Sequence, residues 1–258
     1  METADSDQLL RHIPAVDQEG YKSRKNALNC NQPEFYWIFK NMDFERWQST
    51  NGTQVLWLSG PAECRISNAS SHIVDLVKEK PTSAQHLVLF FFCSTVAAGA
   101  SIVIPFVSTI IHQLASRLPQ LKKGITTAFL RTLLNAILEG EPLSDPEQSR
   151  FKNDDSAGAT IGKILKEPSS EYWRALRAAM DIVHEQELSL IIDGLDKIRH
   201  QEHEFVQEIL SFIEHLRERS STTRVLLTSR PQAEMKEILS ELSCIEYDKE
   251  RKGSVVSS

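Results

Sequence analysis

An apolar run that breaks at a glycine suggests a loop able to bind phosphate. In the stretch VLWLSGPAECRIS, residues 55–67, the run ends at Gly60. A phosphate-binding loop (P-loop) would continue with four variable positions, a second glycine, a lysine and a serine or threonine. Counted from Gly60, those last three positions hold Arg65, Ile66 and Ser67. The spacing is therefore that of a P-loop, but the second glycine and the lysine are replaced.

Both replacements remove groups on which phosphate binding depends. A residue other than glycine at position 65 can block the tight wrap of backbone N–H groups around the phosphates. Ile66 supplies neither the charge nor the donor of a lysine, a loss of about 2–3 kcal/mol, or about 30- to 150-fold in affinity. Arg65 could substitute, but its planar fork is not a compact ammonium. We expect weak nucleotide binding and still weaker hydrolysis.

Two further apolar runs end in polar residues of matching chemistry. The run LSLIIDGLDK carries Asp193 and Asp196, and RVLLTSRP carries Arg230. An aspartate after a buried strand holds Mg²⁺ in P-loop enzymes, so we expect Asp193 and the Ser67 hydroxyl to bind the ion. Asp196 would position or activate a water, and the donors of Arg230 could reach a terminal phosphate. Taken alone, such an aspartate is often a helix cap, and such an arginine often lies in a surface salt bridge.

The elements that must position these residues alternate between strand and helix. We expect strands at 54–59, 87–93, 187–193, 224–229 and 244–247. Helices are expected at 67–80, about 101–117, 121–140, 161–165, 172–184, 204–219 and 232–242. Continuous apolar strands alternating with helices predict an α/β fold, a three-layer P-loop NTPase-like parallel sheet flanked by helices. Ligands of such sheets bind at the carboxyl ends of the strands, where Gly60, Asp193 and Arg230 would meet.

Three segments are expected along the chain. Residues 1–50 form a helical lead-in, in which PEFYWIFKNMDFERW is interpreted as a helix that packs its aromatic face on the adjoining domain. Residues 51–248 form the P-loop domain, and the polar stretch at 141–159 is an exposed loop within it. Residues 249–258 form a disordered tail.

The composition argues against nucleic acid as a partner. The 258 residues carry 29 basic and 35 acidic side chains, a net charge of −6, which gives no electrostatic footprint for nucleic acid. The short basic stretches Lys22–Lys25 and Lys249–Lys252 are interpreted as solvated surface.

Cysteine usage and hydropathy place the chain inside the cell. Four cysteines lie far apart without metal spacing, and no secretory signal opens the chain, so we expect a reduced, cytoplasmic protein. Residues 87–116 lack charged side chains, but their serine, glycine and proline residues favour a strand followed by a helix over a membrane span.

The three motifs together resemble a known family. VLWLSGP, LSLIIDGLDK and RVLLTSRP resemble the P-loop, Walker B and sensor 1 segments of NACHT-type STAND ATPases. More narrowly, they resemble the fungal set with a nephrocystin-type N-terminal domain, and FYWIFKNMDFERW is similar to the segment before the P-loop there. The resemblance covers roughly residues 30 to 250. It implies a signalling switch that binds ATP or ADP with magnesium, oligomerises on activation and acts in fungal nonself recognition or programmed cell death.

The resemblance also assigns roles to individual residues. Gly60 matches the P-loop glycine and Ser67 the magnesium hydroxyl, while Asp193 and Asp196 match the Walker B acids and Arg230 the sensor arginine.

The sequence departs from the family pattern in three ways. Arg65 and Ile66 replace the glycine and lysine, Lys197 stands where a further acid is common, and no repeat array or effector domain is recognisable.

Our main hypothesis is therefore a catalytically impaired NACHT-like module, not an enzyme, that acts through protein partners or self-association and binds Mg-ATP or Mg-ADP weakly or not at all. The alternative is an active ATP- or GTP-dependent STAND switch that tolerates the altered loop. A P-loop kinase and a nonfunctional gene fragment are lesser alternatives. The signal sensed and the identity of the partner do not follow from the sequence.

Overall fold

The chain divides into two compact units. The computed structural model of the protein describes residues 13–27, 36–49, 51–79, 86–97, 100–140, 169–198, 202–219 and 222–246. One unit comprises Met1–Ala15 and Val103–Val183, and the other comprises Val16–Ile102 and His184–Ser258. Most of the expected lead-in thus shares a unit with the strands. The expected loop at 141–159, the helix at 161–165 and the tail at 249–258 lie outside the described residues.

A five-stranded sheet forms the centre of the larger unit. Its strands are β1 (Gly52–Ser59), β2 (His86–Phe92), β3 (Glu187–Asp193), β4 (Thr222–Ser229) and β5 (Ser243–Glu246). All described pairings are parallel, in the order β2-β3-β4-β1-β5. After their first residue, β2, β3 and β4 are buried throughout, because a parallel sheet is covered on both faces. The expected α/β class with a parallel sheet flanked by helices is confirmed, and it is consistent with a three-layer P-loop-like fold.

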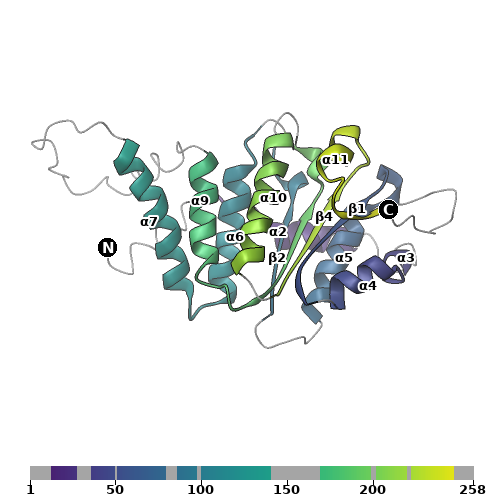
Figure 1. Ribbon diagram of the computed structural model, residues 1–258, viewed down its shortest axis with the longest axis horizontal. Coiled ribbons are helices and arrows are strands. Elements are labelled where there is room, and N and C mark those ends of the chain that lie inside the picture. The colour runs from purple at the N-terminus through teal and green to yellow at the C-terminus, as the bar shows by residue number, and fades with distance from the viewer. Residues whose placement is uncertain are drawn as a thin grey trace, which may run out of the picture. The chain divides into compact units, whose positions relative to one another are not determined.

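Helices cover this sheet from two sides. Within the larger unit, α5 (Ile66–Glu79) and α4 (Met42–Ser49) lie on one side and α10 (Glu202–Arg219) on the other (Figure 1). The apolar side of α5, with Ile73, Val74 and Val77, packs against alternate residues of the strands in one core cluster. The amphipathic pattern expected for α10 is confirmed, since Phe205, Ile209, Phe212, Ile213 and Leu216 are all buried.

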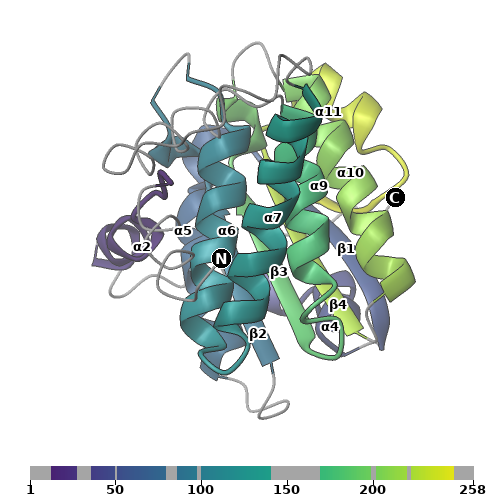
Figure 2. The same cartoon turned by 90° about the vertical axis from the view of Figure 1, so that its left-hand side faces the viewer.

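In the described part of the smaller unit, three helices pack on one another. They are α6 (Val103–Arg117), α7 (Lys122–Gly140) and α9 (Ser169–Met180), and they lie side by side (Figure 2). The rings of Phe106 and Trp173 meet with centroids 5.4 Å apart. The uncharged segment 87–116 is thus a strand followed by a helix, as expected. None of the helices in the described ranges has the length and hydropathy that crossing a membrane requires.

The aromatic segment before β1 differs from the expectation. It forms two helices, α3 (Tyr36–Phe39) and α4, where one was predicted. The interruption falls at Asn41, whose side-chain oxygen accepts the backbone N–H groups of Asp43 at 2.7 Å and Phe44 at 3.4 Å. Asparagine is a favoured N-cap because it satisfies N–H groups that the first turn leaves without partners. Asn41 therefore starts a new helix.

The strand order indicates where on the sheet a ligand would bind. From β1 the chain crosses to β2, past β4 and β3, whereas from β4 it crosses in the opposite direction to β5, past β1. Neighbouring strands whose connections diverge leave a crevice at their carboxyl ends. Ser59 and Ser229 are register partners, so β1 and β4 end at the same level and the crevice lies directly beyond them.

The cap at Asn41 gives a test of this helix boundary. Changing Asn41→Ala removes the acceptor for two N–H groups and should lower the free energy of unfolding by about 1 kcal/mol, measured by urea denaturation. Asn41→Asp keeps an acceptor and should cost much less. Equal stability of the alanine variant and the natural chain would contradict the assigned cap.

Candidate functional site

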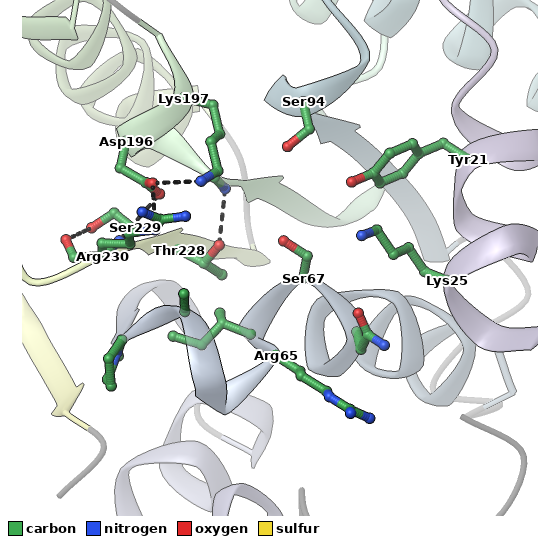
Figure 3. Close-up of a pocket in the computed structure, with 16 residues that line it drawn as sticks. Tyr21, Lys25, Arg65, Ser67, Ser94, Asp196, Lys197, Thr228, Ser229 and Arg230 are labelled. Carbon is green, nitrogen blue, oxygen red and sulfur yellow. Dashed lines mark hydrogen bonds and ion pairs between the residues drawn. The ribbon is translucent and has the colours of Figure 1, made fainter. Parts of the chain in front are cut away.

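A cavity of about 270 Å³ opens at the carboxyl ends of β1, β3 and β4 (Figure 3). Five residues predicted from the sequence to form a site line it together: Gly60, Arg65, Ser67, Asp196 and Arg230. The sixth predicted residue, Asp193, is fully buried beside the cavity. The structure therefore brings together residues that are up to about 170 positions apart in the sequence.

The loop after β1 keeps the backbone conformation that a P-loop glycine would favour. Arg65 has φ 48° and ψ 43°, in the left-handed region, and it is the one non-glycine residue with positive φ in the described part of the chain. For a side-chain-bearing residue this conformation costs about 1–2 kcal/mol. The replacement of the glycine thus leaves the turn in place and adds strain to it.

Backbone N–H groups of the loop and the side chain at its lysine position make contacts within the protein. Residues Ala62–Cys64 form a short 3-10 turn, so the N–H groups of Cys64 and Arg65 donate to the carbonyls of Pro61 at 3.1 Å and Ala62 at 3.3 Å. Ile66 packs against the apolar core between α5 and the sheet, as well as reaching the cavity wall. The loop therefore presents neither a lysine nor a full set of backbone donors.

Asp193 ends β3 and accepts two hydrogen bonds within the protein. Its Oδ1 accepts the hydroxyls of Ser70 and Thr228, both at 2.7 Å, whereas its Oδ2 has no hydrogen-bond partner among the described residues. Burial raises the pKa of Asp193, and the hydrogen bonds from the hydroxyls of Ser70 and Thr228 offset part of that rise. A buried carboxylate with one unsatisfied oxygen is an acceptor for a donor or a cation.

The P-loop-like fold implies a magnesium ion at this carboxylate, and the residues present fit one. The unpartnered Oδ2 of Asp193 and the cavity-lining hydroxyl of Ser67 are hard oxygen donors of the kind that magnesium prefers. Asp193 and Ser67 would hold the ion, which would bring positive charge to phosphate oxygens. In the described ranges, no group of three or more His, Cys, Asp or Glu residues could hold a metal unaided.

Asp196 is occupied by two cations. Its carboxylate lies 3.1 Å from Lys197 Nζ and 3.3 Å from Arg230 Nε, and it also accepts the backbone N–H of Arg230 at 3.1 Å. The Asp196 side chain is 5% exposed and that of Arg230 is 49% exposed. These contacts hold Arg230 at the cavity. They also place two positive charges around Asp196, the acid that was expected to position or activate a water.

Sequence reasoning missed residues that reach the cavity from other elements. Tyr21 and Lys25 come from α2 (Gln18–Ala27), and Ser94 follows β2. The interpretation of Lys22–Lys25 as solvated surface holds for Arg24, which is exposed, but is wrong for Lys22, which is buried, and Lys25 lines the cavity. The partners that fix α2 lie about 50 residues away, so no local pattern reports them.

Comparison with known families covers part of the chain. A model of the family described as Nephrocystin 3, N-terminal matches residues 34–143, which include the loop at 60–67. Over that part, the match supports a nephrocystin-type N-terminal domain. The segments with Asp193, Asp196 and Arg230 lie beyond it. No curated protein matches the chain.

The strained turn gives a stability prediction. Arg65→Gly should raise the free energy of unfolding by about 0.5–1 kcal/mol, because relief of the left-handed strain outweighs the entropy of the added glycine. Arg65→Asn should gain less, and Arg65→Ala should gain nothing. Urea denaturation of the three variants decides it, and destabilisation by glycine would contradict the strain.

The buried carboxylate gives a pH prediction. The folded chain holds the Asp193 proton more tightly than the unfolded chain, whose pKa is near 3.8. The free energy of unfolding therefore falls as pH rises from that value through the raised folded pKa, and the full loss persists above it. Asp193→Asn lacks this fall, so in a chelator-containing buffer it should gain stability on the natural chain between about pH 4 and pH 8. If the stability–pH curves of the natural chain and the Asp193→Asn variant run parallel, the buried Asp193 carboxyl is not the cause of the fall in stability.

Proposed function

We propose that the chain is a NACHT-like module of an intracellular signalling protein, of the kind used in fungal nonself recognition, with impaired ATP binding and hydrolysis. It acts by associating with protein partners or with further copies of itself. The observation that carries the proposal is the loop after β1, where the left-handed backbone is kept at Arg65 while Ile66 stands in the lysine position and packs against the core.

Three features of the loop support impaired nucleotide binding. Ile66 offers no charge, and the N–H groups of Cys64 and Arg65 already donate within the 3-10 turn. The guanidinium of Arg65 runs away from Ser67, so it does not replace the lysine in this arrangement (Figure 3). The lysine alone is worth about 2–3 kcal/mol of binding free energy. Together these features favour affinities in the millimolar range over those of an ATP-driven switch.

The state of Asp196 supports impaired hydrolysis. A general base must present a free carboxylate to the water that it activates. The carboxylate of Asp196 instead pairs with Lys197 and Arg230, so it is not presented free to a water. An arrangement that binds nucleotide weakly and lacks a base favours a role in association over one in turnover.

An active ATP- or GTP-dependent STAND switch is the second candidate. It is favoured by the unpartnered Oδ2 of Asp193 near Ser67, which suits Mg²⁺, and by the basic character of the cavity. Under this alternative, Mg-ATP would raise the melting temperature of the natural chain, and Asp193→Asn would abolish both that rise and turnover.

Calorimetric titration with ATP and ADP, with and without Mg²⁺, tests the proposal. The natural chain should give no measurable heat at micromolar nucleotide. The double variant Arg65→Gly, Ile66→Lys should bind about 30- to 150-fold more tightly, because it regains a charge-assisted contact. The matched control Arg65→Gly, Ile66→Met repairs the backbone without the charge and should stay weak. Micromolar binding by the natural chain, with turnover that depends on Asp193, would establish the second candidate instead.

A further inference from the structure

The cavity is basic although the chain is acidic. Its lining includes four cations, Lys25, Arg65, Lys197 and Arg230, and one carboxylate, Asp196, an excess of three positive charges in a chain of net charge −6. Charge of one sign gathered in a concave site favours ligands of the opposite sign. The cavity is therefore suited to an anion.

The four cations do not have equal access to the centre of the cavity. Lys197 and Arg230 both contact Asp196, and the Arg65 side chain runs outward. The Lys25 side chain extends from α2 toward Ser67 (Figure 3). An ammonium at that place approaches the Ser67 hydroxyl, in a cavity whose loop carries Ile66 in place of the P-loop lysine.

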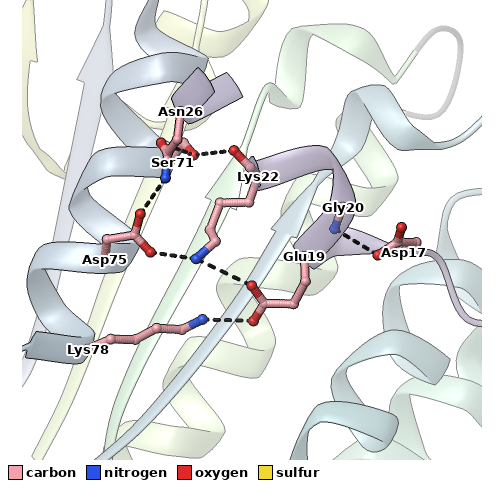
Figure 4. Close-up of polar contacts among 8 residues, drawn as sticks. All are labelled: Asp17, Glu19, Gly20, Lys22, Asn26, Ser71, Asp75 and Lys78. Atoms are coloured by element: carbon pink, nitrogen blue, oxygen red, sulfur yellow. Dashed lines mark hydrogen bonds and ion pairs between the residues drawn. The ribbon is translucent and has the colours of Figure 1, made fainter. Parts of the chain in front are cut away.

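The helix that carries Lys25 is fixed in place by buried polar contacts. At its start, Gln18 accepts the N–H of Phe92 at 2.7 Å and donates to Thr95 Oγ1 at 2.9 Å. One turn later, Lys22 pairs with Asp75 of α5 and lies 3.3 Å from Glu19 (Figure 4). Lys25 is therefore presented by an anchored helix.

The turn of α2 that bears Lys25 is anchored as well. Asn26 donates to Asp75, and the Ser71 hydroxyl donates to the Asn26 side chain at 2.7 Å and to the Lys22 carbonyl at 3.1 Å (Figure 4). Since Ser71 and Asp75 lie on α5, the helix that begins at the loop, these contacts tie the position of Lys25 to the loop itself. A preorganised cation binds an anion with less entropy loss than a flexible surface lysine.

We propose that Lys25 is the phosphate-binding cation of this cavity, supplied by α2 in place of the lysine missing at Ile66, and that the ligand is a nucleoside di- or triphosphate. A compact ammonium suits this role, because it neutralises phosphate charge without the fixed fork of a guanidinium. The inference rests on the proposed function, since it takes the cavity to be a weak nucleotide site. It adds the residue on which the remaining affinity depends.

Lys25 also lies over the ring of Tyr21, with Nζ 5.2 Å from the centroid. This contact alone would give the lysine a structural role. The test must therefore separate ligand binding from the packing of α2.

Titration with ADP, followed by protein NMR chemical shifts, reads affinities up to about 10 mM. Lys25→Gln should weaken ADP binding about tenfold, the loss of one charge-assisted contact, while adenosine binding stays unchanged. The matched control Arg24→Gln removes an exposed charge from the same helix and should change ADP affinity less than about twofold. In an Ile66→Lys background, where a second cation serves the phosphates, Lys25→Gln should cost less than about threefold.

Other results would overturn the inference. Equal losses for Lys25→Gln and Arg24→Gln would leave Lys25 only its contact with Tyr21. No ADP response by the natural chain up to about 10 mM would remove the phosphate role of Lys25 and leave an impaired module intact. Tight, Asp193-dependent binding and turnover that ignore Lys25 would overturn both the inference and the proposed function.

Discussion

The hydrogen bonds that Ser70 and Thr228 donate to the buried carboxylate of Asp193 connect the elements on which the whole site depends. Ser70 lies on α5, Thr228 ends β4 and Asp193 ends β3, so one oxygen atom fixes the helix after the loop to the two central strands. The N–H of Gly194 donates to Thr228 Oγ1 at 3.0 Å and extends the network. Because the carboxylate is buried, loss of either hydroxyl would leave it poorly solvated. The free-energy cost of breaking these two hydrogen bonds therefore keeps the edge of the sheet in register with the loop.

Around this junction, the loop after β1 has the spacing of a phosphate-binding loop and a left-handed turn at Arg65, but it carries Ile66 where such a loop has lysine. The turn survives at Arg65 despite the left-handed strain, since the start of α5 is held by its own contacts to the sheet. The lysine position, by contrast, holds Ile66, which is partly buried and packs against the apolar core. Positive charge reaches the cavity from α2, β4 and the turn after β3 instead. A basic cavity without a loop lysine or a free base favours weak binding over turnover.

The sequence predicted the frame of the site better than its lining. Apolar runs report buried parallel strands directly, and the P-loop spacing placed Gly60 and Ser67 at the cavity because only one short loop joins β1 to the first turn of α5. Lys25 and Tyr21 were missed because their position depends on Asp75 and Phe92, which are distant in sequence. The break at Asn41 was missed as well, since aromatic spacing continued across it while the cap acted on the backbone.

The most direct test of the central claim is the nucleotide content of the purified chain. The natural protein and the Arg65→Gly, Ile66→Lys variant would be denatured, and the released nucleotides separated by anion-exchange chromatography and quantified against protein. We expect no retained nucleotide in the natural chain, because the weakened contacts release it during purification, and at most a small retained fraction in the repaired variant, whose affinity is about 30- to 150-fold higher. Stoichiometric nucleotide in the natural chain would contradict the account and would make the altered loop a working nucleotide site.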